Sequence, residues 1–346
     1  MNGELPLVMP DAEYARRGAS YRTPLKGRRR LCRRAGWWLL ALLLVGVSAP
    51  ALAGLQPLSA ALSLPSALAP PSLGTVLTTI TVGEQPTFIA LAPGGNRVFV
   101  LNALARTISV VDPVTDQVRA TLATTPLSRA TSLAVTPDGT TLVVLGSLPD
   151  TSGQALLLDA STGALLGVVS LGQIPLRVVL SADGTRAFVT SSAAGRLEII
   201  DLASRQVVQQ VLIGAQPHSL SLAPDGQRVY IVQAVARRLT VVDVASGQVV
   251  GQLVLPALTR LTGISLSADG RQAYVVDGIN EALWVVDLND LMVLGGIQLG
   301  VYPFALSQVG SDGLLYVAHR SEPGVLGQVS VIQTPARSAL ERPAAP

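Results

Sequence analysis

Residues 222–233 read LAPDGQRVYIVQ, in which a turn-forming Pro-Asp-Gly is followed by an arginine and a run of apolar residues. Five further segments have the same form, and their turn glycines are Gly95, Gly139, Gly184, Gly270 and Gly313. With Gly226 included, successive turn glycines are 44, 45, 42, 44 and 43 residues apart. A period of this length is typical of an architecture in which each copy is one supersecondary unit.

A second marker keeps the same period. The first five copies each contain an apolar strand that ends in aspartate, at Asp112, Asp159, Asp201, Asp243 and Asp287. Each copy divides into four short apolar runs rich in Val, Ile and Leu, and no part of the body has sustained helical periodicity. Four strands in every 42 to 45 residues predict an all-β fold, a β-propeller of six four-stranded antiparallel blades.

The two ends of the repeat array predict how the ring closes. The last copy stops after its third strand, residues 328–333, whereas residues 75–82 (TVLTTITV) resemble a fourth strand that lacks a blade. Pairing these two segments closes the ring and leaves no long open edge. We also expect the Asp-Gly turns to supply the positive φ angles of tight hairpins, and Asp-x-x-Ser/Thr-Gly to form turns capped by the aspartate.

The copies resemble the YVTN family of β-propeller repeats, whose hallmark is a Tyr-Val-x-Asn strand in a unit that ends in Val-x-Val-Ile-Asp. That strand reads FVLN at 99–102, FVTS at 188–191, YIVQ at 230–233, YVVD at 274–277 and YVAH at 316–319. The asparagine is kept only in the first copy, and rings of the family often have seven blades. The resemblance implies the fold over residues 75–333 and says little about activity.

The N-terminal 53 residues have the form of an export signal. Nine basic residues lie between Arg16 and Arg34, the apolar run Trp37 to Val47 follows, and Ala51-Leu52-Ala53 is a small-x-small cleavage site. An uncleaved membrane anchor over residues 37–55 is the alternative. Either reading places the body outside the cytoplasm: periplasmic, extracellular, or membrane-anchored through this segment alone. We interpret residues 54–74, rich in Ala, Pro, Leu and Ser, as a linker, 75–334 as the propeller and 335–346 as a tail.

Charge and cysteine content exclude several functions for the body. The whole chain has a net charge of +3, but residues 54–346 contain 16 arginines against 19 acidic residues. Nucleic-acid binding by bulk charge is therefore not expected. The one cysteine, Cys32, lies in the N-terminal segment, so the body has no thiolate nucleophile or cysteine-ligated metal. Standard catalytic and phosphate-loop motifs are absent, and we expect no cofactor and no metal.

A four-strand meander separates the loops of each blade onto two faces. The turns after the first and third strands form one face, where turn chemistry accounts for most of the aspartates. The loops between second and third strands and the connectors between blades form the other face, called here the loop face. Turn geometry does not require the charged residues and histidines of the loop face, so we take it as the ligand or partner face. Its candidate residues are Arg106, Arg177, Arg196, His218, Arg237, Arg238, Arg260, Asp277, His319 and Arg320.

Two classes of function fit this sequence. The first is a non-enzymatic scaffold in the cell envelope that binds a protein or an anionic small molecule through the loop face, with no catalytic residue. The second is an enzyme, either a lactonase-like hydrolase or the propeller subunit of a periplasmic redox enzyme. Asp277 and His319 fall in neighbouring blades, so they are candidates for a functional pair or for an ordinary polar contact.

Overall fold

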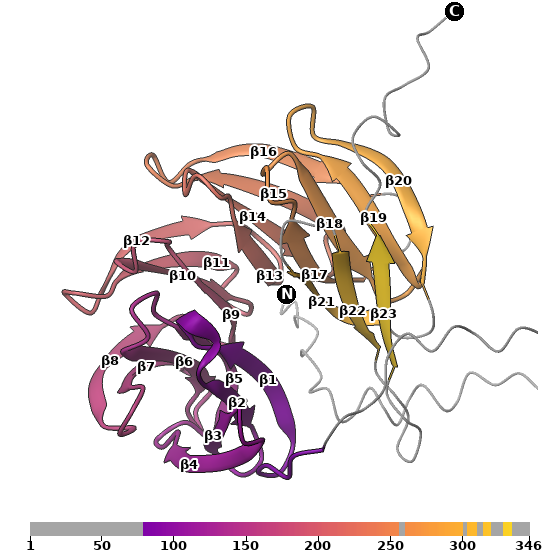
Figure 1. Ribbon diagram of the computed structural model, residues 1–346. Coiled ribbons are helices and arrows are strands. Elements are labelled where there is room, and N and C mark those ends of the chain that lie inside the picture. The colour runs from indigo at the N-terminus through magenta and orange to yellow at the C-terminus, as the bar shows by residue number, and fades with distance from the viewer. Residues whose placement is uncertain (1–78, 256–259, 300–302, 310–313, 320–327, 334–346) are drawn as a thin grey trace, which may run out of the picture. The chain divides into compact units, whose positions relative to one another are not determined.

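The computed structural model describes residues 79–255, 260–299, 303–309, 314–319 and 328–333 (Figure 1). These residues belong to one compact unit that begins at Pro71, close to the predicted start of the propeller at residue 75. The predicted export signal, the linker and the C-terminal tail lie outside the described residues. Within the described part, no helix has the length and apolar character needed to cross a membrane.

The first three sheets follow one another along the chain, and each consists of four consecutive antiparallel strands. The first contains β1 (Pro86–Leu91), β2 (Val98–Asn102), β3 (Thr107–Asp112) and β4 (Gln117–Ala123), with a short 3-10 turn, η2 (Pro93–Gly95), after β1. The second contains β5 (Arg129–Val135), β6 (Thr141–Ser147), β7 (Gly153–Asp159) and β8 (Leu165–Leu171). The third contains β9 (Pro175–Leu180), β10 (Arg186–Ser191), β11 (Arg196–Asp201) and β12 (Gln206–Leu212).

Three further sheets continue the series. The fourth contains β13 (Pro217–Leu222), β14 (Arg228–Gln233), β15 (Arg238–Asp243) and β16 (Val249–Val254). The fifth contains β17 (Leu261–Leu266), β18 (Gln272–Asp277), β19 (Ala282–Asp287) and β20 (Met292–Gln298). The sixth has three strands among the described residues: β21 (Pro303–Val309), β22 (Leu314–His319) and β23 (Gln328–Gln333). The predicted all-β repeat of antiparallel sheets is therefore confirmed.

The first strand of each sheet lies beside the first strand of the next. Contacts run in order from β1 to β5, β9, β13, β17 and β21, while the fourth strands lie farthest from this series (Figure 1). This succession of sheets around their first strands is propeller-like. We call the six first strands the inner strands.

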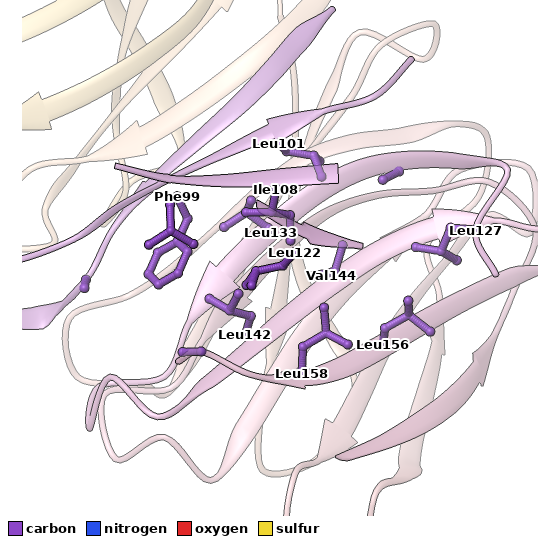
Figure 2. Packing of buried hydrophobic residues seen from close by; sticks show 14 residues of the cluster. Phe99, Leu101, Ile108, Leu122, Leu127, Leu133, Leu142, Val144, Leu156 and Leu158 are labelled. Atoms are coloured by element: carbon purple, nitrogen blue, oxygen red, sulfur yellow. The ribbon is translucent and has the colours of Figure 1, made fainter. Parts of the chain in front are cut away.

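The core is divided among the spaces between consecutive sheets. Five clusters of buried apolar residues each join one sheet to the next, and Figure 2 shows the cluster between the first and second sheets. Strand β6 contributes to two of these clusters. Leu142 and Val144 pack toward the first sheet, whereas Val143 and Leu145 pack toward the third. Alternate side chains of a strand point to opposite faces. Each such side chain contributes about 1.5–3 kcal/mol by burial.

The repeated Asp-Gly turns differ in detail from the prediction. In the second sheet the N–H of Gly139 donates to the carbonyl of Thr136 at 2.8 Å, and Gly139 has a φ of 73°. Asp138 does not share this positive φ, and instead its carboxylate accepts the N–H of Thr140 at 3.0 Å. The hairpin therefore needs the left-handed conformation only at its glycine, where no Cβ opposes it.

The strand predicted to close the ring is only partly within the described residues. Thr79 to Val82 are described and belong to no strand, and residues 75–78 lie outside the described part. Among the described residues β23 forms the edge of the sixth sheet. The pairing of residues 75–82 with β23 therefore stays a prediction.

Candidate functional site

Most of the predicted site residues lie on the loop face. Arg106 and Arg237 are in the loops β2–β3 and β14–β15, Arg196 and Arg238 open β11 and β15, and Arg260 ends the connector before β17. Arg106 and Arg196 are exposed, and the other three are half-buried. Arg320 lies outside the described residues.

The loops between second and third strands share a pattern that the sequence analysis missed. Their second residue is apolar and exposed in three sheets, with exposed fractions of 64% for Leu104, 65% for Val235 and 54% for Ile279. Their last residue has a positive φ of 53–54° and carries a charge at Arg106, Arg237 and Glu281. We call these six residues the loop tips.

The charged residues of the loop tips occupy a position that suits glycine better. In the third sheet the same position is Gly195, with a φ of 64°. A residue with a Cβ costs roughly 1–2 kcal/mol in this conformation. Arg106 and Arg237 both adopt this conformation, and each follows an exposed apolar residue by two positions. The fold does not require arginine or an exposed apolar residue at these positions.

Buried polar pairs join the second and third strands next to these loops. The last residue of the second strand forms a side-chain hydrogen bond with the third strand in five sheets: Asn102 with Ser109 at 2.9 Å, Ser191 with Glu198, Gln233 with Thr240 at 2.9 Å, Asp277 with Trp284 at 3.1 Å, and His319 with Ser330 at 2.7 Å. In the second sheet, where β6 extends one residue further, Gly146 and Leu156 stand at the equivalent positions. The pairs satisfy polar groups that are otherwise out of reach of water.

Three of these pairs also hold the connector that enters their own sheet. Glu198 accepts the N–H of Gly172 at 2.8 Å, and Asp277 accepts the N–H of Arg260 at 3.3 Å. The side-chain amide of Gln233 donates to the carbonyls of Ile213 and Ala215 at 3.2 and 3.1 Å. The polar residues at the strand ends therefore fix the backbone of the loop face.

Asp277 and His319 each have partners within their own sheets. Besides Trp284, the carboxylate of Asp277 accepts the side-chain amide of Asn280 at 2.7 Å and the N–H groups of Ile279 and Asn280 at 3.1 and 3.2 Å. The Nε2 atom of His319 is hydrogen-bonded to Ser330. Every hydrogen bond of Asp277 thus goes to its own sheet or connector. Trp284 packs against the core between the fourth and fifth sheets and also donates to Asp277.

His218 lies at a bulge that recurs in every inner strand. The pairing of first and second strands shifts register at one equivalent residue in all six sheets, namely Thr87, Thr131, Leu176, His218, Thr262 and Phe304. Two of these residues link consecutive inner strands, because Thr131 donates to the carbonyl of Pro175 at 2.7 Å and Nδ1 of His218 is 3.0 Å from the carbonyl of Thr262. A structural contact therefore accounts for the position of His218.

Arg177 is the one predicted arginine that lies within an inner strand. It follows the bulge of β9, and its guanidinium carbon lies 5.1 Å from the ring centre of Phe88 in β1. The side chain is half-buried, and burial lowers the pKa of Arg177 below its ordinary value. Sequence reasoning placed this residue on the loop face but gave no sign of its stacking partner two sheets away.

Among the described residues, no group of three or more His, Cys, Asp or Glu side chains has an arrangement that would hold a metal ion.

No protein-family model matches the chain, and no curated protein matches it. Among solved structures, a chain of Kuenenia stuttgartiensis hydrazine synthase is similar, with a TM-score of 0.51 and 18% identity. The match covers 75% of this chain and 99% of that chain. The likeness is one of fold alone. At this identity it carries no information about substrate or chemistry.

The face opposite the loop face has a pocket of about 340 Å³ between the second and third sheets. Asp138, Asp183 and Arg205 are among its lining residues. Asp183 accepts the hydroxyl of Ser181 and the N–H of Thr185, as Asp138 does from Thr136 and Thr140. Turn formation therefore accounts for these carboxylates, as predicted for this face.

Two carboxylates near the loop face are held by the fold. The carboxylates of Glu198 and Asp277 are buried and hydrogen-bonded to the fold. Glu198 was missed in the sequence, although the recurrence of polar residues seven positions apart, at 102 and 109 or 191 and 198, is a signal that points to it.

Proposed function

We propose that the chain is an exported, non-enzymatic propeller scaffold that binds a protein partner in the cell envelope through its loop tips. One observation carries the proposal: exposed apolar residues and charged residues recur at the same two positions of the loops in the first, fourth and fifth sheets. The buried polar pairs behind these loops serve the fold and leave the loop tips as the part available for recognition.

The composition of the loop tips suits a protein partner. Isolated exposed apolar residues are common on soluble proteins, but here they recur at one structural position. Arginine is enriched at protein interfaces, and the buried centre of an interface is more apolar than the rest of the surface. In the fourth sheet Val235, Arg237 and Arg238 lie within four residues, which favours a partner surface that is apolar and acidic.

Export and tethering complete the proposal. The basic stretch, apolar run and small-x-small site of residues 16–53 support export, and residues 54–74 would serve as the tether. The resemblance to YVTN repeats supports the propeller fold of the proposed scaffold. We further propose that the body is a closed six-bladed ring, with residues 75–82 as the fourth strand of the sixth blade.

An enzyme subunit is the second candidate. The chain would then be either a lactonase-like hydrolase or, as the alternative, the propeller subunit of a periplasmic redox enzyme. In that case the loop tips would bind the other subunits, and the partner captured with the chain would itself carry the cofactor.

Affinity capture from the envelope fraction tests the proposal. The tagged full chain, extracted under native conditions, should retain a reproducible protein partner, and the double variant Val235→Ser/Arg237→Ser should lose it while remaining folded. Metal content and lactone hydrolysis are measured on the same purified chain. Retention of the partner by the variant contradicts the loop-tip surface, and metal-dependent hydrolysis abolished by His319→Ala contradicts the non-enzymatic role.

A further inference from the structure

Arg97 joins the first and second sheets on the face opposite the loop face. It stands two residues after the turn glycine of the first sheet. Its guanidinium donates from Nη1 to the carbonyl of Ala160 and from Nη2 to the carbonyl of Gly139, each at 3.0 Å. Gly139 is the turn glycine of the second sheet, and Ala160 directly follows its third strand. One arginine side chain therefore lies between two neighbouring sheets and binds two backbone carbonyls of the second.

The same position between the second and third sheets has no arginine. Thr141 stands two residues after Gly139, where the first sheet has Arg97, whereas the third and fourth sheets have Arg186 and Arg228 at the equivalent position. The pocket of about 340 Å³ lies at this place, and Thr141 is one of its lining residues. The short side chain of threonine therefore leaves open a space that arginine fills one sheet earlier.

The two carbonyls that Arg97 contacts have equivalents in this pocket. They belong to Gly184, the turn glycine of the third sheet, and to Leu202, which directly follows β11, and both residues line the pocket. In the described part of the chain, neither carbonyl accepts a hydrogen bond from another residue. A backbone carbonyl is a strong acceptor, so the pocket offers a pair of acceptors for which the described chain supplies no donor.

The rest of the lining suits a cation that has an apolar stem. Asp138 and Asp183 contribute two carboxyls against the one guanidinium of Arg205. Hydrogen bonds from hydroxyl groups of their own turns lower the pKa of both carboxyls, so both are ionised at neutral pH. The guanidinium of Arg205 donates to the carbonyl of Leu166 in β8. Apolar side chains, among them Leu157, supply surface that methylene groups can cover.

We propose that the pocket between the second and third sheets binds a guanidinium group, carried by an arginine side chain of another polypeptide or by a free small molecule. The guanidinium takes the place that Arg97 fills between the first and second sheets and donates to the carbonyls of Gly184 and Leu202. Its planar array of donors suits two acceptors held apart by the backbone better than a compact ammonium does. This site lies on the face opposite the loop tips and does not rest on their proposed function.

Saturation-transfer NMR on the purified full chain tests the site at constant ionic strength. The probes are N-acetylarginine methylamide and methylguanidine, and the uncharged control is N-acetylcitrulline methylamide. Water competes for exposed carbonyls, so the titrations extend to millimolar concentrations of probe. The wild type should bind a guanidinium probe saturably and should not bind the control. Tighter binding of the arginine probe identifies an arginine of a polypeptide, and binding of methylguanidine at least as tight identifies a free small molecule.

The variant Thr141→Arg supplies the missing side chain from the protein itself. It should fold and should unfold at a higher temperature than the wild type, because the new guanidinium can make the two hydrogen bonds that Arg97 makes. It should also bind the guanidinium probes at least about tenfold more weakly, since its own side chain fills the pocket. The variant Thr121→Arg is the matched control: it adds the same residue at an exposed position of β4 and should bind as the wild type does.

Four results would overturn the proposal: no saturable binding of either guanidinium probe to the wild type, equally tight binding of the citrulline control, undiminished binding by Thr141→Arg, or an equal loss in Thr121→Arg. Failure of Thr141→Arg to fold would also contradict it, since a pocket shaped for arginine should accept this one. Capture of the protein partner through the loop tips should be unaffected by Thr141→Arg, so failure of this site is distinguishable from failure of the proposed scaffold function.

Discussion

Ile89 and Leu133 occupy the same position of the inner strand in consecutive sheets, but Ile89 is 65% exposed and Leu133 is 1% exposed. Leu133 packs against the preceding sheet, as do Val178, Leu220 and Ile264 at the equivalent position of the next three sheets. In a closed ring the sheet that precedes the first is the sixth. Ile89 therefore lies on an exposed face of the first sheet, and the sixth sheet would cover this face if the ring were closed.

Truncation tests this closure. Removal of residues 1–74 should leave a folded body, because that segment is the proposed signal and tether. Removal of residues 1–84 should destabilise the body strongly and cause aggregation, since it deletes the proposed partner of β23 and leaves an unpaired edge. Size-exclusion chromatography and thermal unfolding of the two variants measure the difference.

The shorter truncation is the matched control for the longer one. Equal stability of the two would show that the ring closes elsewhere, or that it does not close, and the proposed six-bladed ring would fail.

The variant Asp277→Ala should lower the free energy of unfolding by about 2–4 kcal/mol, because it leaves the donors of Trp284 and Asn280 without their charged acceptor. A double-mutant cycle with His319→Ala, followed by urea unfolding, measures the coupling of the two residues. We expect additive effects within about 0.5 kcal/mol, since each residue has its own partners. A coupling above about 1 kcal/mol would instead support a functional pair.

The variant Gly146→Ala should be destabilising by about 1–3 kcal/mol. A Cβ at this position would lie 2.4 Å from the carbonyl oxygen of Arg129, which is backbone and has little room to move. Gly295, in β20, is the control, because a Cβ there meets nothing within 4 Å. Similar unfolding midpoints for Gly146→Ala and Gly295→Ala would contradict the close approach of the start of β5 to β6.

Acid should destabilise the body through the turn aspartates. Hydrogen bonds from Ser161 and Thr162 hold the pKa of Asp159 well below its ordinary value, and those from Ser204 lower the pKa of Asp201. A carboxyl whose pKa is lower in the folded state contributes stability above its unfolded pKa of about 3.9 and loses it as the pH falls through the folded value. Thermal midpoints should stay level from about pH 7 to 5 and fall below about pH 4.

The variant Asp159→Ala isolates one such turn. Its thermal midpoint should lie below that of the wild type at pH 7, and the gap should narrow below about pH 3 as the wild-type carboxylate takes up a proton. A gap that is constant with pH would contradict the role given to the charged carboxylate.

The repeat period was enough to predict repeated antiparallel sheets and the places of the turns between their strands. Glycine at the turn, as at Gly139 and Gly184, and aspartate at the end of the third strand, as at Asp159, have local causes that a short stretch of sequence contains. The strands around them follow from apolar runs of the right length, since the faces that consecutive sheets turn toward each other are buried.

Contacts between distant parts of the chain were not predicted from the sequence. Glu198 lies in a strand next to Leu197 and Ile199, and its burial depends on a partner, Gly172, that belongs to the previous connector. The stacking of Arg177 on Phe88 joins residues 89 positions apart. Such contacts depend on how the sheets are placed, which no local pattern of residues specifies.

The most direct test of the central claim compares matched variants on the two faces of the first sheet. Leu104→Ser/Arg106→Ser removes an exposed apolar residue and an arginine from the loop face, and Val114→Ser/Arg119→Ser removes the same pair of residue types from the opposite face. Biolayer interferometry would measure the affinity of each folded variant for the partner captured from the envelope fraction. We expect the loop-face variant to bind at least about tenfold more weakly than the wild type and the opposite-face variant to match it. Equal affinity of all three proteins, or loss of binding only in the opposite-face variant, would contradict the account.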